Sequence, residues 1–377
     1  MSTPQRKVLL LFGGQSSEHS VSCVTAAGVL RAIDTDRFTV IPVGVTQDGV
    51  WTLVAPQQVL TYSFDGGVEP MVEPQGQPVR LMRSDSPDAA ARLVTDAQPG
   101  EMVKMLTGID VVFPLLHGPY GEDGTVQGLL ELIGVPYVGS GVAASAVGMD
   151  KHLMKMAFNA AGLRVGPYQV VTNREWDADP QSCLDRCDSL ELPLFVKPAR
   201  AGSSQGVVRV DDREDLSLAI EEARMHDPKV LIEQGITGRE IECAALEGRR
   251  GEPTRASVGG EVVVDEAAAD LYDYESKYLA DDNARTEAPA QLSEEQATSL
   301  KEHAIIAYDA LGCEGPSRVD FFLDEAGEWI INEINTMPGF TPISMYPQLW
   351  AASGLPYEDL ITELITLAFE RQPGLLR

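Results

Sequence analysis

One stretch of the sequence, RVDFFLDEAGEWIINEINTMPG at residues 318–339, constrains the fold more than any other. Polar and apolar residues alternate at the start of this stretch, residues 325–328 supply a turn, and an apolar run follows. This pattern predicts a β-hairpin. Alternate residues of a strand share a face, so we expect Arg318 to lie beside Asp320 and Glu333 beside Asn335.

The register of this hairpin decides whether its acidic residues meet. A two-residue turn over 326–327 places Asp320 opposite Glu333 and Arg318 opposite Asn335, whereas a three-residue turn shifts the pairing by one. Facing carboxylates repel by up to about 1 kcal/mol, and a divalent cation removes that repulsion. Mg²⁺ prefers oxygen ligands. Asp320, Glu333 and Asn335 therefore form a candidate metal site, and a solvated hairpin face is the alternative.

Charge and composition exclude several classes of function. The chain has 29 basic and 57 acidic residues among its 377, a net charge of −28. Nucleic acid and anionic membranes require cationic surfaces, so neither is expected as a partner. No apolar run approaches the ~20 residues of a membrane span. The five scattered cysteines and the polar start of the chain favour a cytoplasmic location with reduced thiols.

The N-terminal third has the pattern of a parallel α/β unit. An apolar run at 7–12 ends in two glycines and precedes a helical pattern through Ile33. The glycine turn lacks the full dinucleotide fingerprint, which disfavours a dehydrogenase. Glu18, at the predicted helix start, could bind the amino group of a ligand. Alternatively, it could simply be an acidic residue that the helix dipole stabilises at that position. His117 follows a predicted strand at 110–116, where ligands bind in such folds, although a lone histidine is often structural.

Two further segments suggest nucleotide binding. KPARAGSSQGV at 197–207 places Lys197 at a strand end before a loop of small residues, which suits phosphate. The alternative is a plain hairpin loop, since the strand-like VVRV follows directly. Glu233 and Glu240 lie at the ends of a strand connection, where they could bind the amino group and ribose of a nucleotide or remain solvated.

Long-range order along the chain predicts three lobes. Residues 47–105 have little periodicity, and we assign them no function. Residues 265–290 form a long polar stretch containing three tyrosines, which favours a lid over a disordered tract. We expect an N-terminal α/β domain at 1–142, a central domain at 143–248 and a C-terminal domain at 249–377. The class is α/β and α+β.

Six motifs together resemble the D-alanine–D-alanine ligases of the ATP-grasp superfamily: GGQSSEHSVS (13–22), LLHGPYGEDGTVQG (115–128), GSGVAASAVGMDK (139–151), FVKPARAGSSQGV (195–207), YDYESKY (272–278), and RVDFF with NEINTMPGFTPIS (318–344). The resemblance covers nearly the whole chain in order. It implies a three-lobed ATP-grasp fold. It also implies an ADP-forming, ATP-dependent ligase that joins two D-alanine molecules through an acyl phosphate, for peptidoglycan precursor synthesis.

The same resemblance implies roles for individual residues. Residues implied to contact ATP are Lys151, Lys197, Ser204, Glu233, Gln234, Ile236, Glu240, Lys277 and Phe322. Residues implied in catalysis are Glu18, Ser203, Tyr278, Arg318 and Gly339. Residues implied to bind the amino acids are His117, Ser344 and Met345. Asp320, Glu333 and Asn335 would hold two Mg²⁺ or Mn²⁺ ions, and a homodimer is expected.

Specificity within the family rests on the Lys277-Tyr278 pair. Relatives that make a D-lactate ester typically carry a histidine there, so this pair favours the dipeptide over the D-lactate ester. A D-alanine–D-lactate or D-alanine–D-serine ligase is the alternative. Two rival interpretations remain. One is an ATP-grasp ligase for another carboxylate and amine, which would not need EHSVS or HGPYGEDG. The other is a non-catalytic nucleotide-binding regulator, which would not need Arg318, Asp320 or Glu333.

Overall fold

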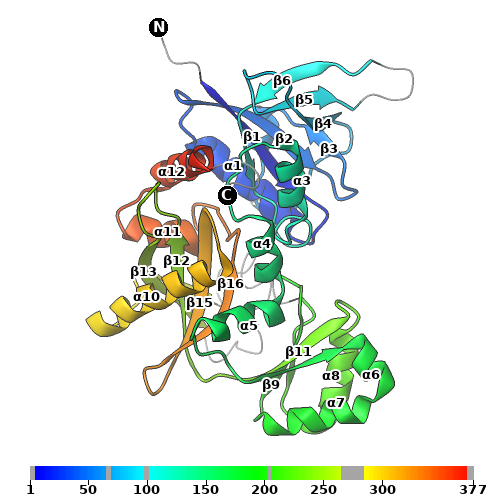
Figure 1. The fold of residues 1–377 in the computed structure, drawn as a ribbon, viewed down its shortest axis with the longest axis vertical. Coiled ribbons are helices and arrows are strands. Elements are labelled where there is room, and N and C mark those ends of the chain that lie inside the picture. The colour runs from blue at the N-terminus through cyan, green and yellow to red at the C-terminus, as the bar shows by residue number, and fades with distance from the viewer. Residues whose placement is uncertain (1–4, 65–68, 97–101, 203–204, 265–283, 372–377) are drawn as a thin grey trace.

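The structure is a computed structural model that describes residues 5–64, 69–96, 102–202, 205–264 and 284–371. Three sheets lie in three lobes, one above the other along the long axis of the molecule (Figure 1). This arrangement agrees with the three-lobed fold expected from the sequence. Among the described residues, no helix is long and apolar enough to cross a membrane.

The N-terminal lobe is a seven-stranded sheet in the order β6-β5-β4-β3-β2-β1-β7. Strand β1 pairs in parallel with β2 and β7, as the α/β pattern predicts. The segment at 47–105, for which little periodicity was found, contributes the antiparallel strands that extend this sheet, the last of which ends at Ile109. The elements are β1 (Arg6–Gly13), α1 (His19–Ala32), β2 (Phe38–Val45), β3 (Trp51–Leu53), α2 (Pro56–Val59), β4 (Gln77–Arg83), β5 (Ala91–Thr95), β6 (Met105–Ile109), β7 (Val111–Pro114) and α3 (Thr125–Ile133).

The helical pattern expected from Ala143 to Ala161 divides at Asp150. This residue is extended, with φ −99° and ψ 102°, and its carboxylate accepts hydrogen bonds from the backbone N–H groups of His152 and Leu153. A buried aspartate that caps a helix forces a new helix to begin. The two helices are α4 (Val142–Met149) and α5 (Lys151–Ala160).

The central lobe is a four-stranded antiparallel sheet in the order β10-β9-β11-β8. Its apolar face packs against helices α6–α8, and its other face carries Lys197, Glu233 and Phe195. Along β11, Ile232 faces the helices and Leu231 faces the other side, because successive residues of a strand face opposite sides of the sheet. The elements are β8 (Tyr168–Thr172), α6 (Asn173–Ala178), α7 (Pro180–Arg186), η1 (Cys187–Ser189), β9 (Leu194–Pro198), β10 (Val208–Val210), η2 (Arg213–Asp215), α8 (Leu216–Ala223) and β11 (Lys229–Gln234).

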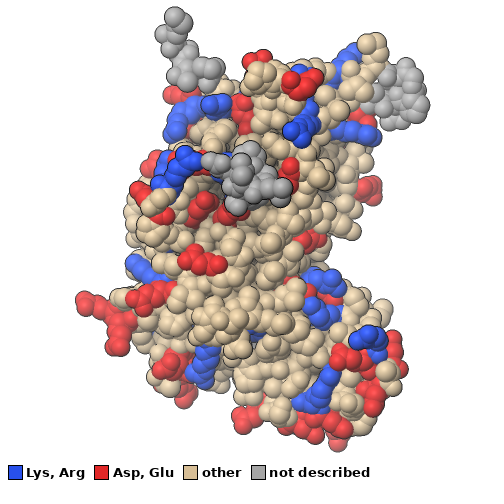
Figure 2. Space-filling model, in the orientation of Figure 1, with Lys and Arg blue, Asp and Glu red and all other residues tan. Residues whose placement is uncertain are grey.

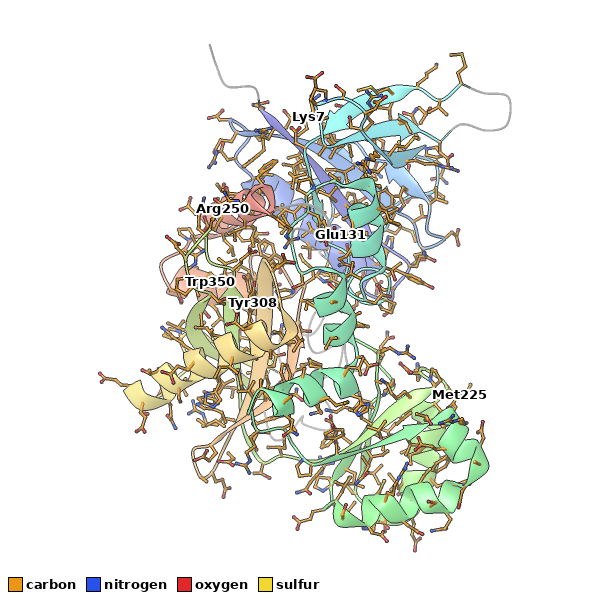
Figure 3. All side chains as sticks on the ribbon, in the orientation of Figure 1. Lys7, Glu131, Met225, Arg250, Tyr308 and Trp350 are labelled. Carbon is orange, nitrogen blue, oxygen red and sulfur yellow. The ribbon has the colours of Figure 1, made fainter. Side chains whose placement is uncertain are left out.

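The third lobe is a five-stranded antiparallel sheet in the order β14-β13-β12-β15-β16. Odd-numbered residues of β12, such as Cys243, pack with α10, and even-numbered residues, such as Ala244, pack with α11 and α12. Figure 3 labels Tyr308 on α10 and Trp350 on α11. The elements are β12 (Gly238–Leu246), β13 (Arg255–Val264), β14 (Ala284–Glu287), α10 (Glu294–Leu311), β15 (Pro316–Asp324), β16 (Trp329–Asn335), α11 (Met345–Ala352) and α12 (Tyr357–Glu370).

The first and last parts of the chain share one core. Buried residues of β1, α1 and β7 contact buried residues of α11 and α12, so the C-terminal helices cover the N-terminal lobe. Figure 1 shows α12, in red, beside α1, in blue. The loops that follow β1 and β7 are thereby brought to the face of the five-stranded sheet that bears α11.

Candidate functional site

The predicted hairpin is present, and Asp320 of β15 lies directly opposite Glu333 of β16, with Arg318 opposite Asn335. The turn, however, is not the two-residue one that we assumed. Asp324 pairs with Glu328 across a three-residue loop, and a β-bulge after Asp320 restores the register. A bulge adds one residue to one strand, and here the extra residue is Asn332. The two acids therefore meet for a reason that the sequence did not reveal.

A third carboxylate, which sequence reasoning missed, belongs to this group. Glu242 of β12 lies opposite Asp320 on the other side of β15, and both side chains are buried. The signal was present in the sequence, because REIECAAL places Glu240 and Glu242 two residues apart and hence on one strand face. No local pattern indicated that β12 pairs with β15.

Arg318 binds two of these carboxylates. Its Nε and Nη2 each donate to Asp320 at 2.7 Å, and its Nε lies 3.1 Å from Oε2 of Glu242. Asn335 Nδ2 also donates to Asp320 at 3.1 Å. Burial alone lowers the pKa of Arg318, but the adjacent carboxylates outweigh burial and raise it well above its usual value. A fixed cation therefore lies among the carboxylates of Glu242, Asp320 and Glu333, which form what we call the acidic face of β12, β15 and β16.

Three side chains on this face have the donor chemistry for a hard cation. Glu333, Asp320 and Asn335 offer carboxylate and amide oxygens. The described residues contain no cluster of three or more His, Cys, Asp or Glu side chains close enough to hold a metal ion by themselves. A bound Mg²⁺ would therefore complete its coordination with water or phosphate oxygens, which is its usual preference.

A second charged group lies on the polar face of the central sheet. Lys197 Nζ donates to Oε2 of Glu233 at 2.7 Å, and Lys155 Nζ lies 3.1 Å from Oε1. Burial raises the pKa of Glu233, but the two lysines more than compensate and lower it to about 2. Burial likewise opposes the charge of Lys197, while Glu233 prevails and raises the pKa of that lysine. Sequence reasoning identified Lys197 and Glu233 but missed Lys155.

Lys151 connects the central lobe to the acidic face. Its backbone N–H donates to Ala199 O at 2.9 Å, and its Nζ donates to Ala201 O at 2.8 Å, both in the KPARAGSS loop. The same Nζ lies 4.0 Å from Glu333. The loop itself joins the antiparallel strands β9 and β10. It is therefore a hairpin loop, but one that a lysine ties to the candidate metal residues.

The other residues implied to contact a nucleotide lie where β11 leads into β12. Glu240 lies opposite Phe322, which is half-buried. The side chain of Ile236 packs against Gly166, where an added Cβ would lie 2.8 Å from Ile236 Cδ1. The side-chain oxygen of Gln234 accepts the backbone N–H of Glu191, so any nucleotide contact of Gln234 would come from its backbone.

Glu18 lies where two loops meet. It is the N-cap residue of α1, and its side chain makes no capping hydrogen bond to that helix. A Cβ built on Gly118 would lie 2.8 Å from Glu18 Oε2, and one built on Gly202 would lie 3.0 Å from the same atom. The carboxylate therefore adjoins the backbone of both the HGPYGEDG loop and the KPARAGSS loop. Only glycine permits this approach.

His117 joins the N-terminal lobe to the segment after β16. Its Nδ1 lies 3.2 Å from Met337 O, and its buried Nε2 has no hydrogen-bond partner among the described residues. Burial lowers the pKa of His117, and the Glu18 carboxylate opposes this effect in part. A neutral imidazole with one free nitrogen can accept a hydrogen bond from a ligand.

Glu122, four residues after Gly118, was also missed. Its Oε2 accepts the backbone N–H of Gly118 at 2.6 Å. Burial, and then the charge of Glu18, raise the pKa of Glu122 to about 8. A carboxyl group with a raised pKa beside a second carboxyl group is a pattern typical of functional sites.

The remaining predicted residues divide into two groups. Gly339 lies two residues after Met337, and Ser344 is the N-cap residue of α11, with its Oγ 2.7 Å from Thr341 Oγ1. Met345 is buried and adjoins Gly260. The other group lies outside the described residues and comprises Ser203, Ser204, Lys277, Tyr278 and most of the expected lid at 265–290.

Comparison with known proteins agrees with the resemblance seen in the motifs. Residues 7–140 match the family model "D-ala D-ala ligase N-terminus", and residues 157–366 match "D-ala D-ala ligase C-terminus". A D-alanine–D-alanine ligase of Arthrobacter sp. (strain FB24) is 55% identical over 98% of this chain and 95% of its own length. One from Streptomyces griseus subsp. griseus is 50% identical over 99% of this chain and 95% of its own length.

Two solved structures of ligases are also similar to this chain over nearly its whole length. The VanG D-Ala:D-Ser ligase from Enterococcus faecalis superposes with a TM-score of 0.80 at 32% identity, covering 97% of this chain and all of that one. The D-alanine–D-alanine ligase from Coxiella burnetii gives a TM-score of 0.79 at 33% identity, covering 98% and 95%.

Proposed function

The chain belongs to the D-alanine–D-alanine ligase family, and on that premise we propose how its residues join two D-alanine molecules at the expense of ATP. The protein is an ADP-forming ligase, and its product is D-alanyl-D-alanine, a peptidoglycan precursor. The observation that carries the proposal is the acidic face of β12, β15 and β16, with Arg318 fixed within it. Phosphoryl transfer requires charge neutralisation and alignment more than a covalent nucleophile.

The nucleotide would lie between the central sheet and the acidic face. Lys151 and Lys197 would neutralise phosphate charge, and Lys151 already lies between the KPARAGSS loop and Glu333. Glu233, Gln234, Ile236, Glu240 and Phe322 would contact the base and ribose, and Ser204 and Lys277 would add further phosphate contacts. Two Mg²⁺ or Mn²⁺ ions held by Asp320, Glu333 and Asn335 would neutralise the phosphates when bound.

The first D-alanine would bind at the junction of the two glycine loops. The Glu18 carboxylate would hold its ammonium group, and neutral His117 would accept a hydrogen bond there. The carboxylate of this D-alanine would thereby face the phosphate-binding residues, so that its oxygen attacks the terminal phosphorus of ATP, ADP leaves, and an acyl phosphate forms. Orientation of the reactants in this way is a major source of rate enhancement.

The second D-alanine would bind near Ser344 and the backbone of Met345. Its amino group attacks the acyl phosphate, and the oxyanion that forms would be stabilised by Arg318 and the Gly339 N–H. Phosphate then leaves. Ser203 and Tyr278 would join Glu18 in closing the site against water, because an exposed acyl phosphate hydrolyses.

Product specificity and assembly can be measured directly. We expect purified protein with ATP and Mg²⁺ to release phosphate with D-alanine in preference to other amino acids. With D-alanine plus D-lactate or D-serine at neutral pH, D-alanyl-D-alanine should be the main product, and a predominance of the ester or of the D-serine dipeptide would overturn the assignment. We also propose a homodimer in the cytoplasm, which sedimentation and cell fractionation test.

A further inference from the structure

Lys155, in the second turn of α5, has no role in the scheme above. Its side chain is only 4% exposed. Lysine is rarely so deeply buried unless it is paired. Its Nζ lies 3.1 Å from Glu233 Oε1 and 5.9 Å from the centroid of the Tyr168 ring. Figure 1 shows α5 lying along the gap between the central and C-terminal lobes.

Glu233 is held on both sides yet keeps hydrogen-bonding capacity. Lys197 donates to Oε2, and Lys155 Nζ lies 3.1 Å from Oε1. An ionised carboxylate has about four lone-pair sites and no donor. The group can therefore accept a hydrogen bond from a ligand, but it cannot donate one.

We propose that Lys155 is a positioning residue for nucleobase selectivity: by fixing the Glu233 carboxylate as an acceptor, it makes the site take 6-amino purine nucleotides and reject 6-oxo purine nucleotides. This inference rests on the proposed function, in which Glu233 contacts the base. A 6-amino group donates to Glu233, whereas a 6-oxo group sets two acceptors against each other. Sites that hydrogen-bond a substrate group reject analogues without it by up to about 10⁴–10⁵-fold.

Removal of Lys155 should weaken this discrimination. A buried carboxyl group left with only Lys197 can rotate or take up a proton, and a protonated carboxyl group is a donor that can meet a 6-oxo group. Lys155 is ion-paired with Glu233, whereas the lysine beside the candidate metal residue Glu333 is Lys151. The loss should therefore appear in KM and in base preference, with little change in kcat for ATP.

The experiment measures kcat/KM with ATP and with ITP for the unmodified protein, Lys155→Met and Lys155→Arg. Lys155→Met should lower the ATP-over-ITP preference by about 10-fold or more, and Lys155→Arg should keep it within about 3-fold, since discrimination follows the hydrogen bond. The N1 position also differs between the nucleotides, but that contribution cancels in the comparison of variants. An unchanged preference in Lys155→Met overturns the proposal.

Lys229→Met is the matched control. Lys229 lies on the same face of the sheet, at 19% side-chain exposure, and pairs with Asp150 rather than Glu233. Its loss should leave the ATP-over-ITP preference unchanged, even if stability falls. If Lys229→Met lowers the ATP-over-ITP preference as much as Lys155→Met does, the effect is not specific to Lys155, and the proposal is overturned.

A second route covers poor folding of the methionine variant. Glu233→Gln, with Lys155 intact, can turn its amide NH₂ towards a 6-oxo group, and it should lower the ATP-over-ITP preference too; an unchanged preference overturns the proposal. Titration calorimetry of ATP and ITP with Mg²⁺ and no amino acid gives the same ratio as a binding measurement. Failure of D-alanine-dependent phosphate release in the unmodified protein would count against the ligase assignment alone.

Discussion

At the scale of single residues, the site brings several charged side chains together, and these side chains differ in how deeply they are buried. Asp320 and Glu242 are buried on one strand face, and Arg318 serves both. Glu333 is more exposed, at 26% of its side chain, and lies opposite Asp320. Charges in these two environments should respond differently to removal, because a buried ion that loses its partner is far more costly than an exposed one.

Arg318→Met should destabilise the protein, whereas Glu333→Gln should not. Loss of the guanidinium leaves two buried carboxylates without their common cation, at a cost of roughly 3–5 kcal/mol. Glu333→Gln keeps the shape of the side chain, and the repulsion from Asp320 that it removes offsets the loss of the 4.0 Å ion pair with Lys151. Both variants should lose at least about 100-fold in kcat, a loss of the size expected when electrostatic stabilisation of the reaction is removed. Urea unfolding and phosphate release give the two readings, and a Glu333→Gln enzyme of normal rate would exclude that residue from metal binding.

Glu122 should make stability depend on pH. Its pKa is raised from 4.5 to about 8 in the folded protein. Between these values the folded state binds a proton that the unfolded state lacks, so this group's contribution to stability falls as pH rises from about 4.5 to 8. Urea midpoints of Glu122→Gln should therefore fall less than those of the unmodified protein between pH 5.5 and 8. Parallel pH profiles for the two proteins would refute the protonated carboxyl.

At the scale of elements, helix starts position the lysines of the site. Asp150 caps α5 and also pairs with Lys229, and Lys151 is the first residue of that helix. In the capping box of α10, Ser293 and Gln296 bond each other's backbone N–H groups, as the S-x-x-Q pattern of residues 293–296 favours. Both caps stabilise a helix, but only the first carries a residue of the proposed nucleotide site.

Asp150→Ala and Ser293→Ala should therefore differ in function more than in stability. Each cap loss should cost about 1 kcal/mol, with more for Asp150 because Lys229 is left partly buried. Only Asp150→Ala should raise KM for ATP, by about 10-fold, a change of the order of one lost charged hydrogen bond. The comparison uses thermal unfolding beside steady-state kinetics, and a similar rise in KM for Ser293→Ala would refute the positional role of Asp150.

At the scale of the whole molecule, Arg371 fastens the end of α12 to the N-terminal lobe. Its side chain is 6% exposed, donates to Tyr137 O at 3.0 Å and Gly139 O at 2.6 Å, and pairs with Glu314 at 3.2 Å.

The surface charge is also visible at the scale of the whole molecule. Figure 2 shows acidic side chains gathered over α6–α8 and the end of α10, and no continuous basic patch on this face.

Arg371→Met should loosen the contact between the lobes. It removes two hydrogen bonds and leaves Glu314, whose pKa burial already raises, without its cation; the expected loss is roughly 3 kcal/mol. Arg6→Met is the control, because Arg6 only covers the Phe369 ring at 5.4 Å from a more exposed position, and it should cost about 1 kcal/mol or less. Hydrogen exchange of 137–139 should rise in the first variant only.

The sequence by itself determined those features that depend only on the spacing of residues close together in the chain. Residues two apart on a strand share a face, so Arg318 with Asp320 and Glu333 with Asn335 could be paired before any fold was known. The capping box at Ser293 and the hairpin after Lys197 follow from neighbours as well. These features involve short chain segments, in which geometry is fixed by bond angles and side-chain type.

Only the tertiary structure decided which distant segments meet. Glu242 joins Asp320 through a pairing 78 residues apart, Lys155 reaches Glu233 from a helix, and Glu18 adjoins Gly202 of the central lobe. The C-terminal helices meet the N-terminal lobe because both bury apolar side chains in one core. Burial of apolar surface is non-directional and depends on the whole chain. For the same reason, the bulge at Asn332 and the antiparallel extension at 51–109 have no signature in local periodicity.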